Sequence, residues 1–387
     1  MRLKSVEDLD VRGRVVLLRA ALNVPIEKRK VKDTQRLRAA LPTIQYLIKH
    51  QAKVVLISHL SKEGESLAPV APVLSRLLKR AVAFVPDSTG PAVEQTIADM
   101  EPGHVIMLEN LRLKKGEEAN DAKFAKSLAA LGDAYVDDDF TVMHRSHASV
   151  VGLPKLLPAA AGFLVQKEVE AITSALDNPK RPLFAIVGGA KISTKIPLIE
   201  NLLKKVDGML IGGAMANTFI AADGGEVGKS LYEKDQMQLT RDISAEATKR
   251  KVSLILPVDV VVASSLGPRA KATVKNLDEV STGDIIADIG PATTAKATQA
   301  IKSAGTIIWN GPVGVAEFNQ FAKSSKKLAR AIAATSATSI IGGGDTAAFL
   351  DKIHMADDFS FVSTGGGAGL ELMAGNKLPG LEPLIKK

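Results

Sequence analysis

Two lysines, one aspartate and a set of glycine-rich turns are the residues of this 387-residue chain whose types and spacing could do chemistry. Lys191 and Lys195 lie four positions apart in "GGAKISTK", and we expect them to share one face at the start of a helix. Lysines there oppose the helix dipole, so a bound anion would relieve the arrangement. Asp345 follows the glycines of "IIGGGDT", where another helix is expected to begin. Together these groups match what a nucleotide with its Mg²⁺ ion requires.

Each of these features also has a purely structural interpretation, and the absence of other motifs excludes several kinds of site. The lysines fit a solvated helix start, and the aspartate fits an ordinary helix N-cap. The motifs G-x-G-x-x-G and G-x-S-x-G do not occur, and "GGEVGKS" has Asp223 where a Walker A loop needs glycine. His144 and His147 have no third ligand at matching spacing, so we expect no metal there.

Composition narrows the class of ligand. The formal net charge of +8 and the pI of about 9.4 would suit nucleic acid, an acidic membrane or anionic small molecules. Aromatic residues make up only 4%, and the basic residues are scattered, so we favour phosphorylated small molecules over nucleic acid or a membrane. No apolar run approaches the length of about 20 residues that a membrane span needs. The N-terminus lacks the apolar core of a signal peptide and the chain has no cysteine, so we expect a cytoplasmic protein.

Short β-branched segments alternate with amphipathic helical patterns along almost the whole chain. This alternation predicts an α/β protein with parallel sheets flanked by helices. The expected strands form two series, which predicts two doubly wound domains. The first series covers residues 14–22, 53–58, 82–85, 104–108 and 134–138. The second covers residues 183–187, 208–211, 253–258, 284–288, 306–309, 338–341 and 359–362, and a helix over 162–178 lies between the two series.

The ends of the second-series strands share a feature. They run into glycine or a polar residue, in "IVGGAK", "LIGGAM", "LPVDV", "DIGPAT", "WNGPVG", "IIGGGDT" and "STGGGA". Ligands of open parallel sheets bind beyond the carboxyl ends of the strands, and glycine lets a ligand approach the backbone. We therefore expect one continuous edge that binds phosphate, with helix N-termini facing the ligand.

The chain resembles the phosphoglycerate kinase family over essentially its whole length. The motifs that carry the resemblance occur in the family's order: "LNVP", "ENLR", "HRSHAS", "AGFLVQKE", "GGAKISTK", "VGKSLYE", "LPVDVVVA", "DIGPAT", "WNGPVGV", "IIGGGDTA" and "STGGGAGLELMAG". The resemblance implies a glycolytic kinase that transfers a phosphoryl group reversibly between 1,3-bisphosphoglycerate and ADP, giving 3-phosphoglycerate and ATP, with Mg²⁺. It also implies a monomer whose two Rossmann-like domains have parallel sheets, an interdomain helix and a cleft between them.

The resemblance also assigns the domains. Residues 1–160 would bind 3-phosphoglycerate, the helix 161–178 would join the domains, and residues 179–372 would bind the nucleotide. The tail 373–387 would pack back on the first domain. Because the substrates would bind to different domains, we expect domain closure before direct in-line transfer.

On the nucleotide side, the resemblance implies that Asp345 binds the metal and that Glu317 contacts the ribose hydroxyls. It also implies that Gly212 and Gly213 form the adenine side of the pocket. The full set implied there is Gly189, Ala190, Lys191, Lys195, Gly212, Gly213, Asn310, Glu317, Gly343, Gly344, Asp345 and Thr346. On the acceptor side, the implied set is Asn23, Arg36, His59, Lys62, Arg112 and Arg145. Arg36, Lys191 and Gly344 would be catalytic, the two cations by neutralising the migrating group. No general base is needed, because the acceptor oxygen is already ionised.

Departures from the family motifs concentrate in the N-terminal half. Ala21 stands in "RAALNVP" where the family's "RVDFNVP" has an aspartate that hydrogen-bonds the glycerate hydroxyl. Ser61 and Lys62 replace the glycine and arginine of "SHLGRP", and lysine lacks arginine's bidentate fork. "DAFGTAHR" has become "DDDFTVMHR", with Thr141 and Val142 in place of smaller residues.

These departures leave three hypotheses open. The chain is an active kinase, or a divergent paralogue that binds nucleotide with a weakened or altered acceptor site, or a nucleic-acid-associated protein, which only the pI favours. An Ala21→Asp variant should tighten acceptor binding if the pocket is otherwise intact.

Overall fold

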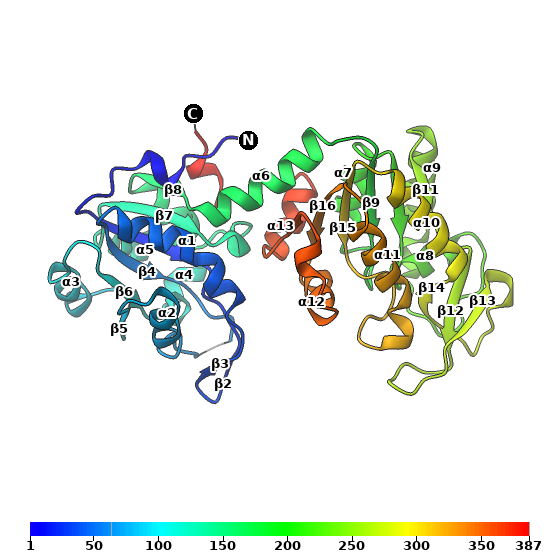
Figure 1. Ribbon diagram of the computed structural model, residues 1–387, viewed down its shortest axis with the longest axis horizontal. Coiled ribbons are helices and arrows are strands. Elements are labelled where there is room, and N and C mark those ends of the chain that lie inside the picture. Colours follow the sequence, from blue (N-terminus) through cyan, green and yellow to red (C-terminus); the bar gives the residue numbers. More distant parts are fainter. Residues whose placement is uncertain (63, 387) are drawn as a thin grey trace. The chain divides into compact units, whose positions relative to one another are not determined.

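The computed structural model describes residues 1–62 and 64–386, which form two compact units (Figure 1). Unit 1 comprises Met1–Glu170 and the C-terminal segment from Lys377 onward, and unit 2 comprises Ala171–Asn376. The division falls inside helix α6 (Phe163–Asp177), in the region where the sequence predicts a long helix. Lys387, the last residue of the predicted tail, lies outside the described residues.

Unit 1 is built on a six-stranded sheet whose strands are all parallel, in the order β5-β6-β4-β1-β7-β8. The strands are β1 (Val15–Ala20), β4 (Lys53–Ile57), β5 (Ala83–Val85), β6 (Val105–Leu108), β7 (Ala134–Asp138) and β8 (Ala159–Ala161). The hairpin β2 (Ile26–Glu27) and β3 (Lys30–Val31) stands apart from it. The helices are α1 (Gln35–Lys49), α2 (Ala71–Leu78), α3 (Pro91–Ala98), α4 (Lys115–Glu118) and α5 (Ala122–Ala129).

The core of unit 1 follows from the pattern of apolar residues. Strand β1 reads "VVLLRA" and is buried along almost its whole length, as expected for a parallel strand covered on both faces. Helix α1 presents Leu37, Ile44 and Leu47 at helical spacing, and they pack in one cluster with Leu18 and Leu56 of the sheet. Each such side chain contributes about 1.5–3 kcal/mol by leaving water.

Unit 2 repeats this plan with a second parallel sheet, in the order β11-β10-β9-β15-β16-β17. Its strands are β9 (Leu183–Val187), β10 (Gly208–Ile211), β11 (Ser253–Ile255), β15 (Thr306–Asn310), β16 (Thr338–Gly342) and β17 (Phe361–Val362). Its helices are α7 (Ile196–Leu203), α8 (Met215–Ala222), α9 (Met237–Lys249), α10 (Pro291–Ser303), α11 (Lys323–Ala333), α12 (Gly344–Lys352) and α13 (Gly367–Met373). The α/β fold with parallel sheets is therefore confirmed.

A third, antiparallel sheet corrects the expectation of one continuous edge. Strand β12 (Asp259–Ala263) pairs with β13 (Thr273–Asn276) and β14 (Ile285–Ile289). The strand expected over 253–258 ends at Ile255, before Pro257, which lacks the N–H that a ladder needs. The strand expected over 284–288 lies in this antiparallel sheet, so "DIGPAT" does not belong to the edge of the parallel one.

In each parallel sheet the strand order reverses beside the first strand of the sheet, and in unit 1 it also reverses where β6 lies between β5 and β4. In unit 1, β1 lies between β4 and β7, and in unit 2, β9 lies between β10 and β15. Ligands of such sheets bind beyond the carboxyl ends of the strands at the point of reversal. The loops that follow β1 and β7, and those that follow β9 and β15, are therefore where a site is expected.

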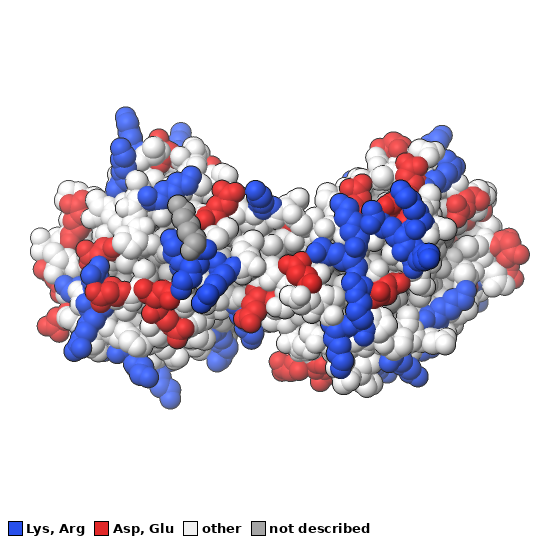
Figure 2. Space-filling view, turned by 90° about the horizontal axis from the view of Figure 1, so that it is seen from above, with Lys and Arg blue, Asp and Glu red and all other residues white. Residues whose placement is uncertain are grey.

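Surface charge is spread over the molecule. Lys and Arg side chains occur on both units in Figure 2, with Asp and Glu between them. The net charge of +8 is thus not confined to one stripe of the face shown. Among the described residues, no helix has the length and apolar character to cross a membrane.

Candidate active site

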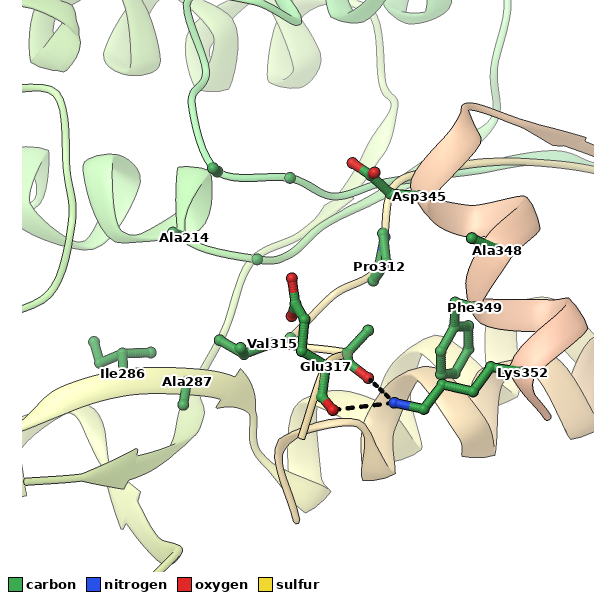
Figure 3. Close-up of a pocket in the computed structure, with 15 residues that line it drawn as sticks. Ala214, Ile286, Ala287, Pro312, Val315, Glu317, Asp345, Ala348, Phe349 and Lys352 are labelled. Atoms are coloured by element: carbon green, nitrogen blue, oxygen red, sulfur yellow. Dashed lines mark hydrogen bonds between the residues drawn. The ribbon is translucent and has the colours of Figure 1, made fainter. Parts of the chain in front are cut away.

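Unit 2 contains a cavity of about 420 Å³ at the carboxyl ends of its parallel strands (Figure 3). Five residues that the sequence assigns to nucleotide binding line it: Gly189, Ala190, Gly213, Glu317 and Asp345. The other lining residues are largely apolar: Ala214, Ile286, Ala287, Pro312, Gly314, Val315, Ala316, Ala348, Phe349 and Lys352. A mostly apolar hollow with a few polar groups is typical of a small-molecule site.

The glycines at this edge serve two different purposes. A Cβ on Gly213, whose φ is +69°, would lie 2.6 Å from the carbonyl oxygen of Gly189. A Cβ on Gly212 would lie 2.6 Å from the Cβ of Val313. These two glycines therefore let neighbouring turns pack together. Gly344 differs, because a Cβ there would meet nothing within 4 Å, so this position leaves open space for a ligand.

The predicted pairing of Lys191 and Lys195 on one helical face is wrong. Helix α7 begins at Ile196, and Pro197 occupies its first turn, where the fixed φ of proline suits a helix start. Lys195 is the N-cap residue, and Lys191 lies in the preceding loop with its side chain exposed. Both lysines still belong to the loop that follows β9 at the reversal point.

Asn310 and Thr346 form a layer behind the cavity. The Nζ of Lys195 donates a hydrogen bond to Oδ1 of Asn310 at 2.5 Å. The buried Nδ2 of Asn310 has no hydrogen-bond partner among the described residues, and it lies beside Gly343. The backbone N–H of Gly311 donates to Oγ1 of Thr346 at 2.7 Å. Lys195, Asn310 and Thr346 therefore hold the loops in place and do not line the cavity.

Asp345 is not a helix cap. The N-cap of α12 is Gly343, which makes no side-chain cap bond, and the exposed carboxylate of Asp345 lies in the first turn and at the cavity (Figure 3). A negative group in the first turn is stabilised by the helix dipole. Burial lowers the pKa of Lys195, and the carboxylate of Asp345 opposes that shift. The aspartate and the lysine therefore interact electrostatically.

Sequence reasoning missed the face of α12 that lines the cavity. Ala348, Phe349 and Lys352 follow Asp345 at positions i+3, i+4 and i+7, so they share its face. The Nζ of Lys352 donates to the carbonyl oxygens of Ala316 and Glu317 at 3.3 and 3.0 Å. It thus ties α12 to the loop that carries Glu317. The helical period of "GDTAAFLDK" is the signal that could have identified these residues.

Unit 1 gathers cationic side chains near its own point of reversal. Burial lowers the pKa of Arg112, and the like charge of Arg145 lowers it further. Burial lowers the pKa of His147 to about 4, and Arg112, Arg19 and Arg145 add to the shift. The two predicted arginines, Arg112 and Arg145, are therefore close enough to repel each other. A bound anion would relieve that repulsion.

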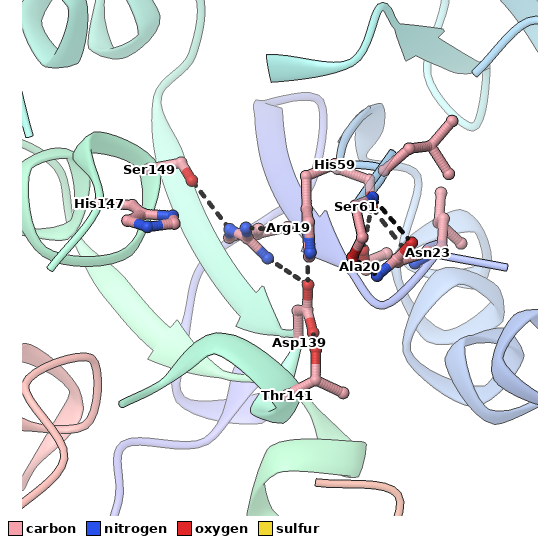
Figure 4. A network of polar contacts seen from close by, with 12 residues as sticks. Arg19, Ala20, Asn23, His59, Ser61, Asp139, Thr141, His147 and Ser149 are labelled. Carbon is pink, nitrogen blue, oxygen red and sulfur yellow. Dashed lines mark hydrogen bonds and ion pairs between the residues drawn. The ribbon is translucent and has the colours of Figure 1, made fainter. Parts of the chain in front are cut away.

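A fully buried ion-pair network lies at the ends of β1 and β7 (Figure 4). Arg19 donates from Nη1 to Oδ2 of Asp139 and from Nε to Oγ of Ser149, the latter at 2.8 Å. The Nδ1 of His59 lies 3.5 Å from Oδ2 of Asp139 and 3.3 Å from Nη2 of Arg19. Burial lowers the pKa of His59 to about 3, so the ring is neutral. With only 2% of its surface exposed, His59 reaches a ligand only through a small remaining edge.

Sequence reasoning identified His59 and missed Arg19 and Asp139. A signal was present, because Arg19 interrupts the apolar run "VVLLRA" and three aspartates follow the apolar residues of β7 at "DDDF". Charged residues at such positions are buried only when they are paired.

The remaining predicted residues of unit 1 form a separate set of contacts. Arg36 donates from Nη1 to the backbone oxygen of Asn23 at 2.6 Å. The side chain of Asn23 exchanges hydrogen bonds with Ser61, at 2.7 Å to Oγ and 3.2 Å from the backbone N–H. Lys62 is exposed and pairs with Glu65 at 3.2 Å.

Comparison with known proteins points to one family. The family model for phosphoglycerate kinase matches residues 6–376. A protein named phosphoglycerate kinase from Moorella thermoacetica is 46% identical over 389 residues, covering 99% of each chain. One of the same name from Pelotomaculum thermopropionicum is 45% identical over 393 residues, covering 100% of each.

Solved structures agree with the sequence comparison. The phosphoglycerate kinase of Coxiella burnetii superposes with a TM-score of 0.91 at 43% identity, covering 99% of this chain and 98% of that one. The enzyme of Pyrococcus horikoshii superposes with a TM-score of 0.85 at 32% identity, with the same coverage.

Proposed function

The chain belongs to the phosphoglycerate kinase family, and on that premise we propose which of its residues carry the reaction. It is a glycolytic kinase that transfers a phosphoryl group reversibly between 1,3-bisphosphoglycerate and ADP, giving 3-phosphoglycerate and ATP. The family match over residues 6–376 carries this conclusion. Nothing in the comparisons supports a paralogue with an altered acceptor site.

We assign the acceptor to unit 1. Two cations near each other, Arg112 and Arg145, support an anion site there, in which a phosphate or carboxylate would take the place of Glu118, now 3.1 Å from Nε of Arg112. The guanidinium of Arg36 and the Asn23–Ser61 pair would hold the rest of the molecule. The proposed contacts are Asn23, Arg36, His59, Lys62, Arg112 and Arg145.

We assign the adenine nucleotide to the cavity of unit 2. The open face of Gly344 at the start of α12 supports phosphate binding, since the first N–H groups of a helix lack intrahelical partners. The unpartnered Nδ2 of Asn310 is a further donor behind the same turn. Glu317 would reach the ribose, and the apolar wall would cover the base.

Magnesium fits this donor set as a partner of the nucleotide. Among the described residues, no group of three or more His, Cys, Asp or Glu side chains could hold a metal ion by itself. Asp345 offers one exposed carboxylate, and Mg²⁺ is commonly held by one or two carboxylates plus substrate phosphates. When bound there with the nucleotide, the ion would neutralise phosphate charge.

The residues of the chain would act by charge and alignment. The acceptor oxygen is already ionised, so no side chain has to remove a proton. Arg36 from unit 1 and Lys191 from unit 2 would neutralise the oxygens of the migrating group, and the N–H of Gly344 would hold a phosphate oxygen. Closure of the two units before in-line transfer stays a prediction, as do the monomeric state and the cytoplasmic location.

A coupled assay with 3-phosphoglycerate and Mg·ATP tests the function. We expect saturable formation of 1,3-bisphosphoglycerate. Nucleotide binding without turnover at millimolar acceptor would contradict the proposal and favour the paralogue instead.

A further inference from the structure

Two departures from the family motifs meet at one place in unit 1. Ala21 stands where "RVDFNVP" has aspartate, and Asp139 stands where "DAFGTAHR" has alanine. Strands β1 and β7 are neighbours, with Arg19 opposite Asp137 and Ala20 opposite Asp138. Ala21 and Asp139 are the residues that directly follow these paired strand ends. The carboxylate absent from one strand end is thus present on the neighbouring one.

The contacts of Asp139 show how it could act. Its side chain is fully buried, and Oδ2 accepts from Arg19 and lies 3.5 Å from Nδ1 of His59. Its Oδ1 accepts a hydrogen bond from the hydroxyl of Thr141 at 2.5 Å. Both oxygens are occupied by the protein, so Asp139 acts on a ligand only through its neighbours.

We propose that Asp139 is a positioning residue of the acceptor site, which holds His59 and Thr141 in place and compensates the buried charge of Arg19. This inference rests on the proposed function. It accounts for Ala21 as well, because a second carboxylate beside Asp139 would be a like charge in a site from which water is excluded. Ala21 is itself only 2% exposed.

The proposal changes what we expect of an aspartate at position 21. Ala21→Asp alone should weaken acceptor binding, because it adds a second carboxylate next to the strand end that Asp139 follows. The double variant Ala21→Asp/Asp139→Ala keeps a single carboxylate at this end of the strand pair. It should bind the acceptor better than either single variant.

Asp139→Asn and Glu117→Gln form a matched pair for the test. Glu117 is also buried and lies 3.9 Å from Arg19, but it accepts hydrogen bonds from Ser149 and has no recorded contact with His59 or Thr141. Both variants remove a negative charge near the same arginine. Asp139→Asn removes a direct neighbour of His59, whereas Glu117→Gln reaches the assigned acceptor residues only through the charge that acts on Arg112.

The measurements are the KM for 3-phosphoglycerate, the KM for Mg·ATP and the melting temperature. We expect Asp139→Asn to raise the acceptor KM by about 10- to 100-fold, with the ATP KM within about twofold. Glu117→Gln should lower the melting temperature and leave both KM values within about twofold. Equal effects of the two variants on the acceptor KM would overturn the proposal, since Asp139 would then be merely structural.

The double variant provides a second test if Asp139→Asn fails to fold. Additive effects of Ala21→Asp and Asp139→Ala on the acceptor KM would overturn the proposal. If the unmodified protein shows no turnover, the proposed function fails. Titration calorimetry with 3-phosphoglycerate then replaces KM, and an unchanged affinity in Asp139→Asn would overturn the inference on its own.

Discussion

The two points of strand reversal share a topology and differ in what fills them. Between β1 and β7 of unit 1, the strand ends carry the buried charges of Arg19, Asp137 and Asp139. Between β9 and β15 of unit 2, they carry bare backbone: a Cβ on Gly188 would lie 2.1 Å from the carbonyl oxygen of Pro312. One folding rule thus places both sites, and the residues at the strand ends decide the chemistry.

This difference bears on how each site tolerates change. Burying an ion pair costs desolvation free energy. Removing one partner then destabilises the fold, because the other charge is left buried and unpaired. A cradle of backbone groups depends on small residues and a particular φ, and its exposed side chains contribute little to folding. Substitution of Asp139 in unit 1 should therefore affect stability and acceptor binding together, whereas substitution of exposed site residues in unit 2 should affect catalysis alone.

Removing one aspartate from each site should give the largest contrast. Asp139→Ala leaves Arg19 buried without its nearest partner, and we expect unfolding to become easier by about 3–5 kcal/mol. Asp345→Ala should change stability by less than about 0.5 kcal/mol, because its side chain is exposed, and lower kcat by about 10²–10³-fold. Urea unfolding measures the stability of the two variants, and the coupled assay measures their kcat. Similar stability losses in the two variants would break the comparison.

Lys191→Ala should be the next largest effect. The side chain of Lys191 is exposed and makes no hydrogen bond or ion pair with the described residues, so we expect an unchanged melting temperature and a kcat lower by about 10²–10³-fold. Lys204→Ala is the control, because Lys204 is also exposed but lies at the far end of α7. Equal kcat values for the two variants would remove Lys191 from the catalytic set.

Two glycine variants should sharpen the distinction inside unit 2. Gly213→Ala adds a Cβ at positive φ and 2.6 Å from a carbonyl oxygen, so we expect a loss of about 1–3 kcal/mol in stability. Gly344→Ala enters open space at the start of a helix, where alanine should be neutral or stabilising by up to about 1 kcal/mol. It should instead raise the KM for Mg·ATP. Thermal melting and ATP titration separate the outcomes, and a destabilised Gly344→Ala would contradict them.

The last prediction concerns the dependence of stability on pH. Burial raises the pKa of Asp288 from 3.8 to about 7, although hydrogen bonds from Ser324 and Ile289 oppose the shift. Between these values the folded state binds more protons than the unfolded state, so stability from this group is present at low pH and is lost as pH rises. Asp288→Asn removes that dependence. As pH rises through this window, the stability of the variant should therefore increase relative to that of the unmodified protein, by up to about 1.4 kcal/mol per pH unit.

Urea unfolding at several pH values across the window provides the measurement. Parallel stability profiles for the two proteins would show that Asp288 does not titrate there.

The sequence predicted most of the fold because parallel strands read as continuous apolar runs. "LFAIV" and "VVLLRA" need no knowledge of their partners to be recognised. The antiparallel sheet was missed, because the strand expected over 253–258 took up the start of "LPVDVVVA", and no strand was expected over Asp259–Ala263 or Thr273–Asn276. The shared face of Lys191 and Lys195 was wrong for a local reason, the helix start imposed beside Pro197.

The buried network could be predicted only in part. The charged residues of "VVLLRA" and "DDDF" are local signals of buried charge, but Arg19 and Asp139 are 120 positions apart, and nothing local says that they are partners. The periodicity of apolar residues indicates which face of a helix or strand is buried. It does not indicate which charged residues contact each other in the interior. The motifs identified the ligand-binding loops, and the structure was needed to find what supports them.

The pairing of the chain's two end segments has a consequence for biosynthesis. Lys4 donates its backbone N–H to Leu384, and Lys386 donates to Arg2, so unit 1 is closed by residues that follow all of unit 2. Because the ribosome delivers the chain from the N-terminus, unit 2 can finish folding while unit 1 still lacks its last segment. The half of the molecule that is translated first is therefore the last to be completed.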